Sequence, residues 1–162
     1  ISIGFGSMTG PNLQAFPNLL LQAVHISGQR AILLSGWAGI GNTPLPYSVL
    51  RIDFAPHEWL FERVAATVHH GGAGTTAASL RAGTPTVIVP HIAEQPLWGK
   101  RVEMLGVGPK AIPRNKLTAE KLASAIHEVV NNREMKRRAM ELSQKIRSED
   151  GINQAIYLIE NM

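Results

Sequence analysis

The chain has 162 residues, of which 44% are hydrophobic and 17% charged, with a formal net charge of +4. This length suits one compact domain that can bury a core without a disulfide or a metal. The absence of cysteine excludes disulfide scaffolds, thiolate metal sites and cysteine nucleophiles, and no apolar run reaches the roughly 20 residues of a membrane span. The sequence begins at Ile1, without a methionine and directly on strand-like residues. We therefore expect a piece of a longer protein, folded as one domain over residues 1–162.

Short β-rich runs alternate with helical patterns along the chain. Strands are predicted at 1–6, 31–34, 49–54, 66–69, 86–89 and 109–112, and helices at 12–27, 57–64, 75–82, 96–105, 118–131, 133–147 and 152–160. Such alternation is typical of parallel βαβ units, and continuous Val, Ile and Leu runs are typical of strands covered on both faces. We expect an α/β fold with a Rossmann-like, doubly wound parallel sheet of about six strands and helices on both faces. Ligands bind such sheets beyond the carboxyl ends of the strands, which here are the loops 6–10, 36–46, 54–57, 70–75 and 91–95.

Most of the positive charge lies in residues 110–147, where ten Lys and Arg stand against four Glu. A basic block of this kind can bind nucleic acid or an anionic surface. Here acidic side chains interleave with the basic ones over residues 131–141, and the block contains no aromatic residue. We interpret it as a solvated helical face and expect no nucleic-acid partner.

Residues 69–76, His-His-Gly-Gly-Ala-Gly-Thr-Thr, follow a predicted strand and open a predicted helix. Glycines let a ligand approach the backbone, and a helix start offers free N–H groups and a positive dipole end, which suits phosphate. The spacing matches neither the Walker loop nor the Gly-x-Gly-x-x-Gly pattern. The alternative is a turn that only packs helix on strand, but the paired histidines favour a ligand. Adjacent histidines on a strand face opposite ways and no carboxylates cluster beside them, so we expect no metal site.

Two other loops carry weaker signals. Residues 4–10 read Gly-Phe-Gly-Ser-Met-Thr-Gly and look like a second phosphate-binding turn. Glu94 and Gln95 place a carboxylate beside an amide, a pair that can hold vicinal sugar hydroxyls, although Glu94 could equally mark a helix start. His25 and His127 fall within predicted helices, where we interpret them as solvated or core histidines.

Taken together, residues 54–61 (Phe-Ala-Pro-His-Glu-Trp-Leu-Phe), 70–76, 81–86 (Arg-Ala-Gly-Thr-Pro-Thr) and 94–99 (Glu-Gln-Pro-Leu-Trp-Gly) resemble a known family. They look like the C-terminal, donor-binding domain of a UDP-glycosyltransferase, similar to the sterol 3-β-glucosyltransferases, to glycosyltransferase family 28 and to enzymes that decorate glycopeptide antibiotics. The resemblance implies the GT-B arrangement, in which two Rossmann-like domains face each other across a cleft. The C-terminal domain binds the nucleotide sugar, and the N-terminal domain binds the acceptor and supplies the general-base histidine. We therefore expect no catalytic residue in this chain.

The family pattern also implies roles for individual residues. It assigns the diphosphate to Ser7, His70, Gly72, Gly74 and Thr75, the nucleoside to Phe54, Pro56 and His57, and the sugar to Glu94 and Gln95. Two positions depart from the pattern. The family usually has Asp where Glu94 stands, which puts the sugar choice in doubt, and plant members carry a ribose-binding Glu where this chain has Ala78.

The resemblance implies an inverting hexosyltransferase that moves a hexose, foremost glucose from UDP-glucose, to a hydroxyl of a lipophilic acceptor such as a sterol. Its partners would be the UDP-sugar and, through the N-terminal domain, the acceptor, with no metal or other cofactor. We expect a cytoplasmic location, with which peripheral membrane contact of the parent protein is compatible. One alternative is an epimerase-like UDP-sugar enzyme, which would need acid and base carboxylates here, whereas Asp53 and Asp150 are the only aspartates. Another is a non-catalytic nucleotide-sugar-binding module.

Overall fold

The computed structural model describes residues 1–6, 15–34 and 44–161. Within these ranges, five strands form one parallel sheet in the order β3-β2-β1-β4-β5. The strands are β1 (Ser2–Gly4), β2 (Ala31–Leu34), β3 (Val49–Ile52), β4 (Thr67–His69) and β5 (Thr86–Ile88). The chain runs outward from β1 through β2 to β3, then returns to place β4 on the other side of β1. This reversal makes the carboxyl ends of β1 and β4 the switch point of the sheet, where such folds bind ligands.

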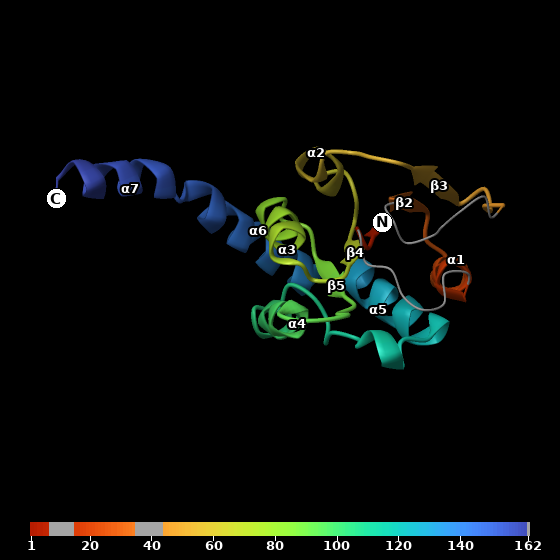
Figure 1. Ribbon diagram of the computed structural model, residues 1–162. Helices are drawn as coiled ribbons and strands as arrows, with labels where there is room; N and C mark the ends of the chain where they lie inside the picture. The colour runs from red at the N-terminus through yellow and green to blue at the C-terminus, as the bar shows by residue number, and fades with distance from the viewer. Residues whose placement is uncertain (7–14, 35–43, 162) are drawn as a thin grey trace.

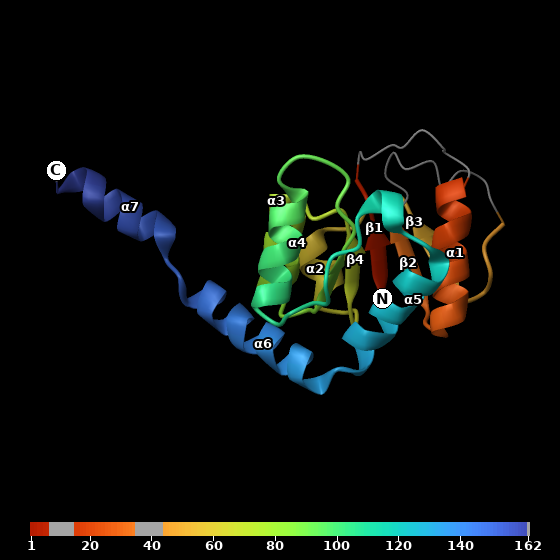
Figure 2. The ribbon, with the colours of Figure 1, turned by 90° about the horizontal axis from the view of Figure 1, so that it is seen from below.

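Helices cover both faces of the sheet, as predicted (Figure 1). They are α1 (Ala15–Ser27), α2 (His57–Phe61), α3 (Ala73–Arg81), α4 (Gln95–Met104), the 3₁₀ turn η1 (Arg114–Lys116), α5 (Ala119–Asn131), α6 (Arg133–Ser148) and α7 (Gly151–Glu160). α1 and α5 pack together on one face, while α2 and α3 pack together over the other. α6 then carries the chain past α3, and α7 extends away from the body with none of its residues buried (Figure 2). None of the helices described is long and apolar enough to cross a membrane.

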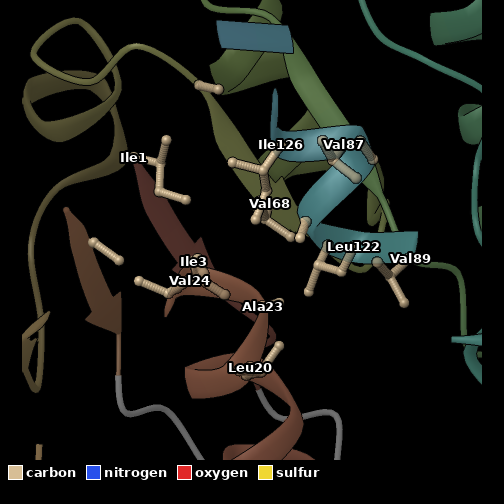
Figure 3. Close-up of a cluster of buried hydrophobic side chains, with 14 of the residues drawn as sticks. Ile1, Ile3, Leu20, Ala23, Val24, Val68, Val87, Val89, Leu122 and Ile126 are labelled. Atoms are coloured by element: carbon tan, nitrogen blue, oxygen red, sulfur yellow. The ribbon is translucent and has the colours of Figure 1, made fainter. Parts of the chain in front are cut away.

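The larger core lies between the sheet and the pair α1 and α5. Leu20 and Val24 of α1 and Leu122 and Ile126 of α5 meet the strands there, and each of these side chains is almost completely buried (Figure 3). The 3.6-residue period of a helix brings residues four apart onto one face. The two side chains of each pair therefore point toward the sheet together. A smaller cluster around Ile88 and Val102 joins β5 to α4.

β1 has a different role on each of its faces. Ile1, Ile3 and Phe5 alternate along it and belong to the large core. The residues between them are Ser2, Gly4 and Gly6, and all three line a cleft on the opposite face. Because successive side chains of a strand point to opposite faces, the alternation of large and minimal residues fills one side of β1 and leaves the other side hollow.

The predicted sixth strand, 109–112, does not form, so the sheet has five strands where about six were expected. The segment still runs beside β5, since Val107 O accepts from Thr86 N at 3.1 Å and Ile88 O accepts from Ile112 N at 3.0 Å. Between these bonds Pro109 has no N–H to donate. Gly108 also lies so close to β5 that an added Cβ would stand 2.1 Å from Thr86 O. The pairing is therefore too interrupted to make a regular strand.

The basic block matches the solvated face that was predicted. On α6, Arg137 pairs with Glu134 and Glu141, and Arg138 pairs with Glu134, all on exposed side chains. Hydrogen bonds from Arg137 and Arg138 lower the pKa of the Glu134 carboxyl to about 2. Arg137 and Arg138 are thus paired with glutamates of the same helix, and Arg147 pairs with Glu62. His25 and His127 are exposed on their helices.

Candidate nucleotide-binding site

A cleft of about 340 Å³ opens at the carboxyl ends of β1, β3 and β4. It contains five of the predicted site residues, namely Phe54, Pro56, His57, His70 and Thr75. Sequence reasoning missed Ser2, Leu34, Asp53, Phe61 and Val68, which also line it. The remaining lining residues, Gly4, Gly6, Ala55 and His69, lie in segments that the sequence singled out without assigning a role to these positions. The large–small alternation along β1 is the signal that could have located the floor of the cleft. The structure therefore unites two segments, 54–57 and 70–75, that were predicted separately.

The wall on the β3 side is the segment that leads into α2. Phe54 is 81% exposed and borders the cleft, so its apolar ring is open to solvent beside a hollow. Pro56 occupies the N-cap position of α2, and His57 begins the helix. The His57 ring stacks on Phe61, with centroids 4.6 Å apart and planes 15° from parallel. Burial lowers the pKa of His57, so this wall presents uncharged rings suited to the flat face of a nucleobase.

His70 stands where the loops after β1 and β4 meet. A Cβ added to Gly72 would lie 2.5 Å from His70 Nε2, and one added to Gly6 would lie 3.8 Å from His70 Cε1. Burial lowers the pKa of His70, while nearby Glu94 opposes that shift and His57 adds to it. His70 Nδ1 is buried and has no hydrogen-bond partner among the described residues. A side chain at position 72 would therefore collide with the His70 ring, and these residues leave the ring's Nδ1 without a hydrogen-bond partner.

The start of α3 forms the other wall. Gly72 is its N-cap residue, with φ −63° and ψ 145°, and no side chain caps the helix. A Cβ added to Gly74 would meet nothing within 4 Å, so this part of the first turn lies open. Thr76 Oγ1 turns back to donate to Gly72 O at 2.9 Å, while Thr75 lines the cleft. Because the first N–H groups of a helix lack intrahelical partners, this uncapped end is an electropositive surface suited to an anion.

His69 is the last residue of β4, and His70 is the first residue of the loop that follows it. Their ring planes are 77° from parallel, with centroids 6.3 Å apart. His69 is completely buried, and burial lowers its pKa to about 3. Its Nδ1 accepts from Gly71 N at 3.0 Å, and its Nε2 lies 2.8 Å from Thr86 Oγ1. Within the described ranges, no three His, Cys, Asp or Glu side chains gather as a metal site.

The predicted sugar pair sits on the loop after β5, outside the lining of this cleft. Gln95 is buried, and its Oε1 accepts from His91 N at 2.7 Å and from Ile92 N at 3.1 Å, which closes the loop. Ala93 has a φ of +52°, an unusual backbone for a residue with a side chain. Glu94 is exposed at the N-cap position of α4, where its side chain makes no capping bond. Its carboxylate lies close enough to influence the pKa of His70.

Some predicted positions cannot be placed. Ser7 lies outside the described residues, and so does most of the 36–46 loop. Gly72 and Gly74 flank the cleft at the start of α3 but do not line it.

The strand order, the cleft at the switch point and the uncapped, glycine-led α3 define a Rossmann-like α/β domain with an anion-compatible site at the switch point of its sheet. Comparison with known proteins narrows the class further. The chain belongs to the family described as erythromycin biosynthesis protein CIII-like, C-terminal domain, whose model matches residues 18–156. The predicted resemblance to the C-terminal domain of glycosyltransferases is thus confirmed.

Curated relatives include sterol 3-beta-glucosyltransferases. The chain is 42% identical to one from Arabidopsis thaliana over 157 residues, which is 96% of this chain and 24% of the relative. It is also 42% identical to one from Aspergillus clavatus over 167 residues, covering 98% of this chain and 12% of that protein. The chain therefore spans a quarter or less of these relatives.

Solved structures share the fold. The glycotransferase of kitacinnamycin superposes with a TM-score of 0.85 at 23% identity, over 99% of this chain and 42% of its own. The glycosyltransferase VinC, solved in complex with DTDP, gives a TM-score of 0.79 at 20% identity, over 99% of this chain and 41% of its own. At these identities the likeness establishes the fold alone.

Proposed function

We propose that this chain is the donor-binding domain, over residues 1–162, of an inverting hexosyltransferase that transfers glucose from UDP-glucose to a hydroxyl of a lipophilic acceptor such as a sterol. The observation that carries the proposal is the single cleft into which Phe54, His57, His70 and Thr75 converge at the switch point of the sheet. The relatives at 42% identity are named for glucose transfer to sterols, which favours this donor and this acceptor class.

The donor can be placed along the cleft from the chemistry of its walls. Uracil would stack on Phe54 beside Pro56 and His57, the wall with uncharged rings. The diphosphate would lie over the first turn of α3, which has no capping side chain. There it would accept from backbone N–H groups near Gly72 and Gly74, from Thr75 and from His70, with Ser7 added from the loop after β1. The hexose would then extend toward Glu94, whose carboxylate lies near His70.

This placement gives the domain a part in the reaction. As the bond to the sugar breaks, negative charge grows on the UDP leaving group. Fixed N–H dipoles of α3 and the ring of His70 would stabilise that charge without first having to reorient. Glu94, with Gln95 bracing its loop, would orient the hexose by accepting from its hydroxyls. On this proposal the donor needs no metal ion.

On this proposal, acceptor binding and deprotonation of the acceptor take place in another part of the parent protein. The relatives are several times longer than the matched region, and we place the acceptor site and the general base that deprotonates the acceptor in a domain outside this chain. The domain alone would then bind the donor and not turn it over. The parent protein would act in the cytoplasm, with peripheral contact to the membranes that hold lipophilic acceptors.

The test is calorimetric titration of this chain with UDP, once in EDTA and once in a buffer that contains Mg²⁺ and no EDTA. We expect UDP and UDP-glucose to bind, and added Mg²⁺ to change neither affinity. ADP serves as the control for base recognition, and dTDP tests the nucleotide with which VinC was solved. Binding that appears only with Mg²⁺ would overturn the metal-free site, and equal affinity for ADP would remove the uracil assignment.

A further inference from the structure

His69 is buried, 1% exposed, directly beneath the turn that carries His70, and both of its ring nitrogens have partners. Its Nδ1 accepts from Gly71 N at 3.0 Å. Its Nε2 lies 2.8 Å from Thr86 Oγ1 and 3.4 Å from Ser79 Oγ. His69 is among the residues that line the cleft, but both of its ring nitrogens are engaged inside the fold. The ring therefore has no free polar atom to offer a ligand, and any effect on ligand binding must act through its neighbours.

The hydrogen bonds assign the position of the ring proton. A backbone N–H can only donate, so Nδ1 must be the unprotonated nitrogen that accepts from Gly71. The proton of the neutral ring is then on Nε2 and is donated to Thr86 Oγ1. Thr86 Oγ1 in turn lies 3.4 Å from Thr67 O, and Thr67 Oγ1 lies 3.0 Å from Ser79 Oγ. Burial keeps the ring in this neutral form, with a pKa of about 3.

The bond to Gly71 closes a tight turn around His70. A side chain that accepts from the N–H two residues ahead is the pattern of an Asx turn, with His69 here in place of Asn or Asp. Gly71 has a φ of +88°, and a Cβ there would lie 2.7 Å from Ile88 Cγ2. On the other side of the turn, His69 O accepts from Val89 N at 2.8 Å. Two hydrogen bonds to His69 therefore fix the backbone between β4 and α3, and the turn between them has a conformation that favours glycine at position 71.

We propose that His69 is a positioning residue of the diphosphate site: by accepting the Gly71 N–H, it sets the turn that aims His70 at the ligand and places the start of α3. This inference rests on the proposed function, because the ligand whose binding depends on the position of the turn is the diphosphate. The role belongs to one nitrogen, Nδ1. The bond from Nε2 to Thr86 ties the ring to β5 and supports the fold.

Two amide side chains separate the roles of the two nitrogens. In His69→Asn, the Asn Oδ1 falls near the place of Nδ1 and can accept from Gly71, but nothing reaches Thr86. In His69→Gln, the Gln Nε2 falls near the place of the ring Nε2 and can donate to Thr86, but Gly71 N loses its acceptor. Both variants replace a buried ring with a smaller amide, so both should lower the midpoint of thermal unfolding to a similar extent.

The variants are compared by UDP calorimetry and by hydrogen exchange of the Gly71 amide without ligand. We expect His69→Asn to bind UDP within about threefold of wild type, and His69→Gln to bind about tenfold more weakly, the effect of one lost buried hydrogen bond. The Gly71 amide should stay protected in His69→Asn and exchange faster in His69→Gln. Equal UDP affinity or equal Gly71 protection in the two variants would overturn the positioning role. If wild type itself bound no UDP, the proposed function would fail, while Gly71 exchange would still decide whether His69 holds the turn.

Discussion

Gly74 offers a substitution whose effects on stability and on ligand binding should have opposite signs. It is the second residue of α3, and a Cβ placed on it would meet nothing within 4 Å. Alanine therefore fits the folded chain without displacing any described atom. In a helix, Gly→Ala removes backbone freedom from the unfolded chain and stabilises the fold by up to about 1 kcal/mol. Near a helix end we expect about 0.5 kcal/mol, a rise of about 1–2 °C in the midpoint of thermal unfolding.

The same methyl group would occupy the space that the proposed diphosphate needs. A phosphate oxygen over the first turn of α3 would have to withdraw from at least one N–H donor. Losing one hydrogen bond to a charged group costs about 1.5–3 kcal/mol, so Gly74→Ala should weaken UDP binding about ten- to hundredfold. Calorimetry gives the affinity, and thermal unfolding without ligand gives the stability of the same sample.

Gly151→Ala provides the matched control. Gly151 also begins a helix, α7, and a Cβ there also meets nothing within 4 Å, but α7 lies far from the cleft (Figure 2). The control should keep wild-type affinity for UDP. Wild-type affinity in Gly74→Ala would refute the placement of the diphosphate over α3, and a loss of stability would refute the open space above Gly74.

Three further outcomes are expected. His70→Ala should cost UDP binding about 1.5–3 kcal/mol, one hydrogen bond to a charged group, and unchanged calorimetric affinity would make the ring structural. Glu94→Ala should weaken UDP-glucose binding by about one to two orders of magnitude and leave UDP unchanged, because UDP has no hexose; equal weakening would mean that Glu94 only supports its loop. Finally, the unfolded chain protonates His69 below its usual pKa near 6.5, whereas the folded chain does so only near 3. The free energy of unfolding should therefore fall as pH drops from 6.5 to 5. His69 should account for a fall of up to about 1.4 kcal/mol per pH unit. Urea unfolding of His69→Asn should show a shallower fall, and an equal slope would contradict the assignment.

Much of the fold was predictable because the strands of a buried parallel sheet have continuous apolar sequences. β2 has the predicted bounds, Ala31–Leu34, and apart from the strand expected at 109–112 the predicted order of strands and helices is the observed one. The sixth strand was wrong for a reason that local sequence hides. Residues 109–112 were predicted as a short strand, but the approach of Gly108 to Thr86 O is set by tertiary packing.

The site was predictable where it depends on chain order. Phe54 and His70 follow different strands of one parallel sheet, whose carboxyl ends lie at a common edge, so their meeting in one cleft follows from the fold. The interior of the Gln95 loop was not predictable, because its hydrogen bonds depend on the φ of +52° at Ala93. His69 was recognised only as the neighbour of His70. Its partner Thr86 lies 17 residues away in sequence, on a strand that only the folded sheet brings beside it.

The two neighbouring histidines have different roles on the proposed function: His69 holds the turn, and His70 contacts the ligand. His69 is buried and both of its ring nitrogens are bonded within the fold, whereas His70 is half-buried and its Nδ1 has no hydrogen-bond partner among the described residues. Both are neutral rings, and neither Lys nor Arg is among the described residues that line the cleft. A diphosphate bound there would be held by oriented N–H dipoles. The strength of their interaction with the ligand depends on how they are placed, whereas a flexible lysine side chain can adjust its position. On this proposal the residue that fixes the turn matters as much as the residue that touches the ligand, so the buried His69 contributes to binding through the half-buried His70.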